Sequence, residues 1–153
     1  MANTENIKSE LIGMCLALVE QRITNAQQAM NAAQESANTE GKSSAGDKYE
    51  TGRAMAQIER DKAAQQLNEA LTLKNSLGRI NINSSGDRVS LGSLVKTDKN
   101  HFFITISIGK QRVGDTDFFV VAPDTPIGKI LIGLKIGSQF SFINQNHTIK
   151  EIL

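Results

Sequence analysis

The chain has 153 residues and a formal net charge of +1, and 39% of its residues are hydrophobic. This length allows one ordinary domain or two small ones. Aromatic residues make up only 5% and tryptophan is absent, so a deep aromatic-lined ligand pocket is hard to build. The near-zero net charge excludes a mainly electrostatic grip on nucleic acid.

Cysteine usage and the first residues indicate the compartment. The single cysteine, Cys15, permits no disulfide within the chain and fits a reducing environment. The apolar run from Ile12 to Val19 is too short to span a bilayer. Acidic Glu5 and Glu10 precede it, where a signal peptide would be basic. We therefore expect a cytoplasmic protein without a membrane partner.

A long helix is predicted from Glu5 to Ala37, a stretch without proline. Its apolar or small residues recur at alternating spacings of four and three: Ile12, Leu16, Val19, Ile23, Ala26, Met30, Ala33 and Ala37. Such a heptad seam is typical of a helix that packs along another helix. Because Ile and Leu give way to Ala, the seam is expected to narrow toward its far end.

A second helix is predicted from Asp47 to the helix stop at Gly78, after a stretch of loop-forming residues at 38–46. A weaker heptad row runs along it, interrupted by Arg60 and Lys74. The row consists of Ala56, Ala63, Leu67, Ala70 and Leu77.

The two helices together predict an antiparallel coiled-coil hairpin over residues 1–78, with its tip at about 38–50. A hairpin of this kind also suits an oligomerisation device, so a structural coiled-coil adaptor is one alternative.

The rest of the chain is predicted to be a linker at 79–88 and a small domain at 89–153. Strand patterns occur at 89–97, 101–108, 117–121, 140–142 and 148–152, and a short helix is expected from Pro126 to Ile132. The predicted fold class is α+β, with a helical hairpin followed by a compact, mostly β module.

Two carboxylates stand where the second helix begins. Asp47 and Glu50 are three residues apart, so on a helix their side chains are neighbours. They match a capping box, which satisfies free backbone N–H groups at a helix start. They could also present oxygen ligands to a divalent cation in a partner's active site. The sequence alone leaves both roles open.

Other candidate chemistry is sparse. His101 and His147 each stand alone in strand-like sequence and are expected to be surface or half-buried residues. No Ser/His/Asp arrangement, P-loop or dinucleotide fingerprint is present. The chain is therefore not expected to be a free-standing enzyme.

A family resemblance rests on two motifs and their order. Gly46-Asp47-x-x-Glu50 lies at the expected hairpin tip. The segment at 124–137 reads Asp-Thr-Pro-Ile-Gly-Lys-Ile-Leu-Ile-Gly-Leu-Lys-Ile-Gly. With the hairpin and small C-terminal domain, these motifs resemble the bacterial Gre transcript-cleavage factors, which rescue backtracked RNA polymerase.

The resemblance implies an FKBP-like C-terminal domain that docks on the rim of bacterial RNA polymerase, while the hairpin enters the secondary channel. Asp47 and Glu50 would help to hold a Mg²⁺ ion shared with the polymerase, whose own active site performs the hydrolysis. No cofactor is expected on the chain alone. A monomer is expected, because a lone hairpin must bury its seam within one chain.

At several positions the sequence differs from the usual pattern of the family, and some basic residues near the tip could make additional contacts. The family usually continues its tip as Asn-Ala-Glu-Tyr, whereas Thr51-Gly52-Arg53-Ala54 follows here, and Ser138 stands where an Asp is usual. Five basic residues are candidates for contact with the 3′ end of the nascent RNA, although they also suit a solvated helix surface: Lys42, Lys48, Arg53, Arg60 and Lys62.

Two further alternatives follow from the resemblance. The departures at the tip leave open a Gre-fold regulator that occupies the polymerase without stimulating cleavage. Because the expected C-terminal domain is FKBP-like, prolyl isomerase activity is a further alternative, but that chemistry needs an aromatic pocket. The six phenylalanines of this half are also needed to fill its core.

Overall fold

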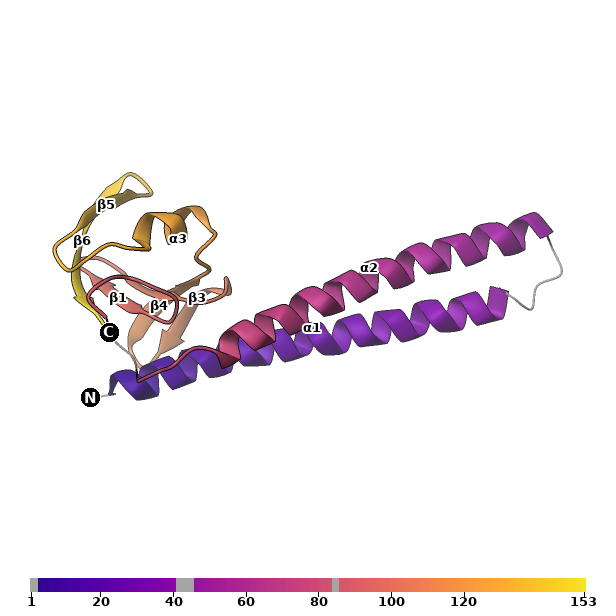
Figure 1. Cartoon of the computed structure of the whole chain (residues 1–153), viewed down its shortest axis with the longest axis horizontal. Coiled ribbons are helices and arrows are strands. Elements are labelled where there is room, and N and C mark those ends of the chain that lie inside the picture. The colour runs from indigo at the N-terminus through magenta and orange to yellow at the C-terminus, as the bar shows by residue number, and fades with distance from the viewer. Residues whose placement is uncertain (1–2, 41–45, 84–85) are drawn as a thin grey trace. The chain divides into compact units, whose positions relative to one another are not determined.

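The computed structural model describes residues 3–40, 46–83 and 86–153, apart from the side chains of residue 40 and residues 46–49. Its two long helices are α1 (Thr4–Glu40) and α2 (Gly46–Gly78). The C-terminal part contains six strands and one short helix: β1 (Leu94–Thr97), β2 (His101–Ile104), β3 (Gly109–Val113), β4 (Thr116–Val121), α3 (Pro126–Leu131), β5 (Gln139–Phe142) and β6 (Gln145–Ile152). The predicted fold class, a helical hairpin followed by a small β domain with one helix, is confirmed (Figure 1).

The chain forms two compact units that do not follow the order of its elements. One unit is 17–75, and the other combines 1–16 with 76–153. Helix α1 therefore contributes its first turns to the unit that contains the sheet. The domain boundaries expected from the sequence, after residue 78 and after residue 88, stay a prediction. In the described parts of the chain, no helix is both long and apolar enough to cross a membrane.

Within the unit 17–75, the hairpin is held by a narrow seam of small residues. On α2 the buried positions are Ala56, Ala63 and Ala70, as the heptad row predicts. Val19, Ile23, Ala26 and Ala33 are the buried positions of α1. Most of these side chains are single methyl groups, so the seam depends on close approach rather than on large buried area.

Arg60 and Lys74, which interrupt the heptad row of α2, lie on the outside of the hairpin. Arg60 is exposed, and Lys74 pairs through Nζ with the Glu20 carboxylate of α1 at 2.7 Å. Both partners of this pair are nearly half exposed, so it contributes at most about 1 kcal/mol. The alanine row, rather than this ion pair, accounts for most of the contact between the two helices.

The predicted start of the seam on α1 is wrong. Ile12 is only partly buried and Leu16 is exposed, whereas Leu11 and Cys15 are completely buried. These turns belong to the unit that contains the sheet, so the stripe facing the core is shifted by one residue. The heptad pattern assumed a single packing partner for the whole helix, and the first turns have a different one.

The sheet has the strand order β3-β4-β2-β1-β6-β5. Strands β2 and β4 are parallel, and every other neighbouring pair is antiparallel. Strand β3 was missed by the sequence analysis, because Gly-Lys-Gln-Arg-Val at this edge shows no apolar alternation. Strand β1 begins at Leu94 rather than 89, and β2 ends at Ile104 rather than 108.

Both faces of the central strands are buried. One face carries Val95, Phe102 and Ile104, which form a core with Ile127 and Leu131 of α3. The opposite face carries Leu94, Phe103, Phe118 and Val120, also almost fully buried. Leu11 and Cys15 of α1 are completely buried too, and they belong to the same compact unit as this face.

Helix α3 begins at a tight turn that only glycine permits. The Thr125 hydroxyl caps the helix by accepting a hydrogen bond from the Gly128 N–H at 3.1 Å, and it donates one to the Ala122 carbonyl at 2.7 Å. A Cβ atom on Gly128 would lie 2.0 Å from that carbonyl oxygen and 2.9 Å from Cα of Pro123. This close approach explains the glycine in the Pro-Ile-Gly motif at 126–128.

We expect Gly128→Ala to destabilise the protein by about 1–3 kcal/mol or more, because the added methyl group meets backbone that cannot move aside. The measurement is the free energy of unfolding in denaturant. Gly13→Ala is the matched control, since Gly13 lies in α1 with no atom within 4 Å of an added Cβ. That control should be neutral or stabilising by up to about 1 kcal/mol. Equal stability of Gly128→Ala and wild type would contradict the packing described here.

Candidate functional site: the hairpin tip and flanking grooves

The two candidate carboxylates lie at the start of α2. The helix begins at Gly46, so the backbone of Asp47 lies in its first turn, and the exposed Glu50 follows three residues later. The Asp47 side chain lies outside the described residues. The N-terminal end of a helix carries free N–H groups that favour nearby negative charge, so this position stabilises a carboxylate whether or not it binds a cation.

Of the five basic candidates near the tip, Arg53, Arg60 and Lys62 have side chains within the described residues. Lys42 and the side chain of Lys48 lie outside the described residues. Arg53 and Arg60 are exposed and seven residues apart, so they share one side of α2. Exposed Lys62 belongs to another side, where it lines a groove that neither arginine reaches. Arg60 and Lys62 therefore lie on different sides of α2, and contact of the five basic residues with RNA stays a prediction.

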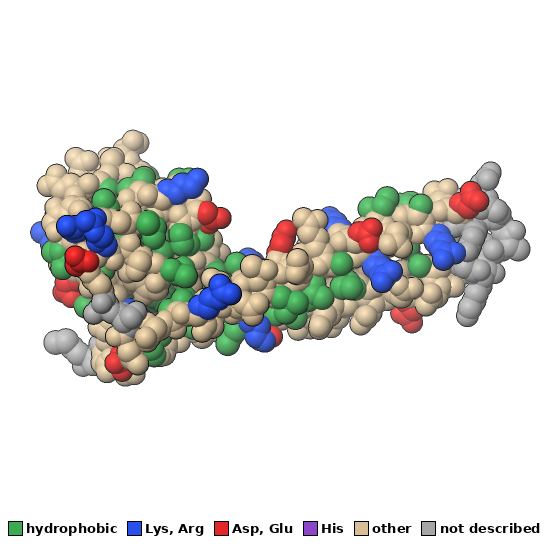
Figure 2. Space-filling model, viewed as in Figure 1, with side chains coloured by type: hydrophobic (Ala, Val, Ile, Leu, Met, Phe, Trp, Pro, Cys, Tyr) green, Lys and Arg blue, Asp and Glu red, His purple; other side chains and the backbone are tan. Residues whose placement is uncertain are grey.

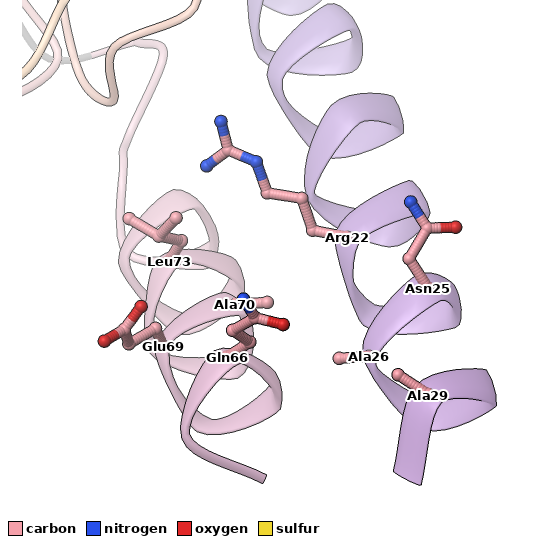
Figure 3. A pocket seen from close by; sticks show the side chains of 8 residues that line it. All are labelled: Arg22, Asn25, Ala26, Ala29, Gln66, Glu69, Ala70 and Leu73. Atoms are coloured by element: carbon pink, nitrogen blue, oxygen red, sulfur yellow. The ribbon is translucent and has the colours of Figure 1, made fainter. Parts of the chain in front are cut away.

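Two adjoining hollows lie along one side of the alanine seam. The larger, of about 580 Å³, is shown in Figure 3, with Ala26 and Ala70 between the helices, Arg22 and Asn25 on α1, and Gln66, Glu69 and Leu73 on α2. The second has a volume of about 410 Å³ and is lined by Ala29, Ala32, Ala33, Glu59, Lys62, Ala63 and Gln66. Ala29 and Gln66 line both, so the hollows form one groove, here called the seam groove.

The seam groove has a signal in the sequence that the heptad pattern alone does not reveal. On α2 the polar residues Glu59, Lys62, Gln66 and Glu69 recur at spacings of three and four, beside the alanine row. On α1 a parallel row runs through Arg22, Asn25, Ala29 and Ala32. Seam alanines are too small to fill the space between such rows, so a groove remains.

The surface of the hairpin carries charges of both signs. Figure 2 shows acidic and basic side chains interspersed along it, without a large area of one sign. Among the described residues, no group of three or more His, Cys, Asp and Glu side chains could hold a metal ion. A cation bound by Asp47 and Glu50 would therefore need further ligands from a partner or from water, since Mg²⁺ prefers six oxygens.

The two histidines differ from each other more than the sequence suggested. His147 is fully buried, which corrects the expectation of a surface or half-buried residue, and its ring stacks on Phe140 at 5.0 Å. His101 is half-buried and its ring lies 5.4 Å from that of Phe118. Neither Nδ1 atom has a hydrogen-bond partner among the described residues.

The phenylalanines of the C-terminal part are all used in packing. Phe102, Phe103, Phe118 and Phe140 are buried, and Phe119 and Phe142 pack against the core on the α3 side of the sheet. An aromatic pocket for a proline substrate would have to be built from these same rings. This arrangement argues against prolyl isomerase activity.

Comparison with known proteins gives little further guidance. No family model and no curated protein matches the chain. Among solved structures, one described as that of the transcription factor Gfh1 aligns with 94% of this chain and 91% of its own, at 16% identity and a TM-score of 0.34. At this TM-score the alignment carries no argument about fold or function.

Lowering the pH should destabilise the C-terminal domain through His101. Burial holds the pKa of His101 below its usual value, and the neighbouring Lys96 lowers it further, while Glu151 acts in the opposite direction. The folded state therefore favours the neutral ring. Its stabilisation is fully present above the unfolded pKa of about 6.5 and is lost as the pH falls through the lower, folded pKa.

The measurement is the free energy of unfolding at pH 7.5 and at pH 5.5, a window above the titration of the carboxylates. The His101→Phe variant keeps a ring against Phe118 but cannot titrate, so it should lose less stability over this window than wild type. Identical losses in the two proteins would show that His101 does not contribute.

Proposed function

We propose that this protein is a cytoplasmic transcription elongation factor that binds bacterial RNA polymerase and stimulates cleavage of backtracked RNA. The carrying observation is the acidic pair at one end of a long hairpin. From Asp47 to Asn75, α2 extends about 40 Å at 1.5 Å per residue. A rod of this kind can carry Glu50, which is exposed, into a channel that a globular domain could not enter.

Asp47 and Glu50 are the residues that would hold a Mg²⁺ ion together with the polymerase. When bound there, the metal would supply charge stabilisation and a polarised water for phosphodiester hydrolysis. In this proposal the chain contributes two carboxylates, and the active site of the polymerase performs the hydrolysis. Contact of Arg53, Arg60 or Lys62 with the 3′ end of the RNA belongs to the same proposal.

The C-terminal domain would supply the docking surface, and its motif at 124–137 supports this role. Ile127, Gly128 and Leu131 are buried and build α3 into the core. Ile130, Ile132 and Ile136 of the same segment are at least 40% exposed. Three large aliphatic side chains in one exposed segment are not explained by packing, and such surfaces often mark protein contacts.

The test of the tip uses Asp47→Asn and Glu50→Gln in a backtracked polymerase complex with Mg²⁺. Each amide keeps the shape of the side chain but lacks the negative charge that favours a Mg²⁺ ligand. We expect each variant to lose most of the cleavage stimulation while polymerase binding and thermal stability stay near wild type. Asp47 lies inside the first turn of α2 rather than at its cap, so a purely structural role of its charge is worth only about 0.3–1 kcal/mol of helix stability and predicts that Asp47→Asn keeps the cleavage activity.

The outcomes separate the competing functions. Full stimulation of cleavage by the Asp47→Asn variant would exclude Asp47 as a Mg²⁺ ligand. Polymerase binding without any cleavage by wild type would favour the regulator that only occupies the channel. Absence of polymerase binding would leave the coiled-coil adaptor.

The docking surface is tested with Ile136→Asp. If the Ile136 side chain is buried on binding, its loss removes about 1.5–3 kcal/mol, so polymerase affinity should fall about ten- to hundredfold. Ile143→Asp is the matched control, because Ile143 is an even more exposed isoleucine in the turn between β5 and β6. Both variants should unfold at the temperature of wild type or above it. Equal loss of affinity in both would contradict a docking role specific to 130–136.

A further inference from the structure

The exposed isoleucines of the C-terminal domain have basic neighbours. Ile130, Ile132 and Ile136 are 41%, 40% and 61% exposed. Lys129 directly precedes the first of them and Lys135 directly precedes the last, and both lysines are exposed. This segment therefore presents aliphatic and positively charged side chains in alternation.

A third basic side chain, Arg88, is fixed beside this segment. Its Nη1 atom donates a hydrogen bond to the Gly133 carbonyl at 3.1 Å. The two backbones are also joined, because the Val89 N–H donates to the Leu134 carbonyl and the Gly133 N–H donates to the Val89 carbonyl, each at 2.9 Å. These contacts fix the conformation of the segment before any partner binds. A preformed surface loses less conformational entropy on binding.

The fold itself does not account for most of these charges. The three isoleucines with Arg88, Lys129 and Lys135 are here called the basic-aliphatic surface. None of its three basic residues forms an ion pair with a described residue. Lys129 lies in the last turn of α3, where a positive charge suits the C-terminal end of a helix. Lys135 lies beyond the helix, so this explanation does not extend to it.

Two exposed aspartates border the basic-aliphatic surface. Asp124 comes before α3, and Asp87 comes before Arg88. From 125 to 137 the sequence contains two lysines and no acidic residue. Three basic and two acidic residues in 87–88 and 124–137 leave a net charge of +1. The lysines, rather than the aspartates, are the direct neighbours of the isoleucines, so the charge next to the apolar side chains is positive.

We propose that the basic-aliphatic surface binds an aliphatic protein surface that is bordered by Asp and Glu side chains. This inference rests on the proposed function and specifies the chemistry of the docking site on the polymerase. The isoleucines would be buried against the aliphatic part, and the basic side chains would face the carboxylates. Complementary charges of this kind speed association and fix the register of the two surfaces.

The composition of the basic-aliphatic surface favours a protein over a nucleic acid or a membrane. Nucleobases bind to single-strand binding proteins by stacking on aromatic side chains. Membrane interfaces are typically anchored by Trp and Tyr. The surface contains no aromatic side chain. Branched aliphatic side chains beside lysine and arginine instead match a protein surface of the opposite charge.

Salt dependence tests the charged part of this contact. The affinity of the full chain for bacterial RNA polymerase is measured between about 0.05 M and about 0.5 M salt, over which the screening length shortens about threefold. At the lower concentration we expect Lys135→Ala to weaken binding about two- to fivefold and Lys135→Glu about tenfold, with both losses shrinking at the higher one. Ile136→Ser should weaken binding about equally at both concentrations, because salt does not screen the burial of an aliphatic side chain.

Lys150→Glu is the matched control. It makes the same change of charge at an exposed lysine of β6, outside the basic-aliphatic surface, so the affinity should stay within about twofold of wild type. Asp124→Asn changes the charge in the opposite direction and should strengthen binding by up to about threefold. All substituted side chains are exposed, so each variant should melt at the temperature of wild type.

The outcomes separate this inference from the proposed function. Equal affinity of wild type and Lys135→Glu, or equal losses in Lys135→Glu and Lys150→Glu, would overturn the acidic partner surface while polymerase binding stands. Absence of polymerase binding by wild type would overturn both. Binding of wild type to vesicles of phosphatidylcholine and phosphatidylserine, or to single-stranded RNA, that Lys135→Glu abolishes would also overturn it, because the partner would then not be a protein.

Discussion

The hairpin depends on the small size of the residues in its seam. Ala26 and Ala33 of α1 and Ala56, Ala63 and Ala70 of α2 are nearly completely buried, yet each contributes only a methyl group. A seam of this kind gains from close backbone approach and from the high helix propensity of alanine rather than from large apolar area. It tolerates little added volume. The same property leaves the seam groove open, because alanines cannot fill the space beside the charged rows.

The parts of the fold that the sequence predicted are those with a repeated pattern and one packing partner. On α2 the predicted seven-residue repeat of Ala56, Ala63, Ala70 and Leu77 is buried, whereas Leu67 between them is only partly buried. On α1 the pattern failed at Ile12 and Leu16, where the helix enters the unit that contains the sheet. Edge strand β3 could not be found by alternation, because its residues are mostly solvated. His147 was misjudged because its polar neighbours Asn146 and Thr148 conceal a position that faces Phe102 and Phe140.

The acidic pair at the hairpin tip stays a prediction, since of its two side chains only that of Glu50 is described. A carboxylate pair at a helix start is visible as spacing, and the exposed Glu50 of α2 fits it. The division of the 124–137 motif into buried and exposed residues needed the structure, because sequence cannot tell which isoleucines a six-residue helix buries. The clash at Gly128 shows that one glycine of the motif is set by packing alone. Motif residues therefore do not all report on function, and Ile130, Ile132 and Ile136 are the ones that packing leaves exposed.

Helix α1 contributes residues to both compact units of the chain. Its first turns, up to Leu16, belong to the same compact unit as a sheet whose first strand begins at Leu94, while the rest of the helix belongs to the hairpin. A segment starting at 89 would lack the part of this unit that contains the completely buried Leu11 and Cys15. The chain therefore offers no single cut that yields two self-sufficient modules. Exchange of the β domain between proteins, in the laboratory or during evolution, would have to carry both ends of the chain with it.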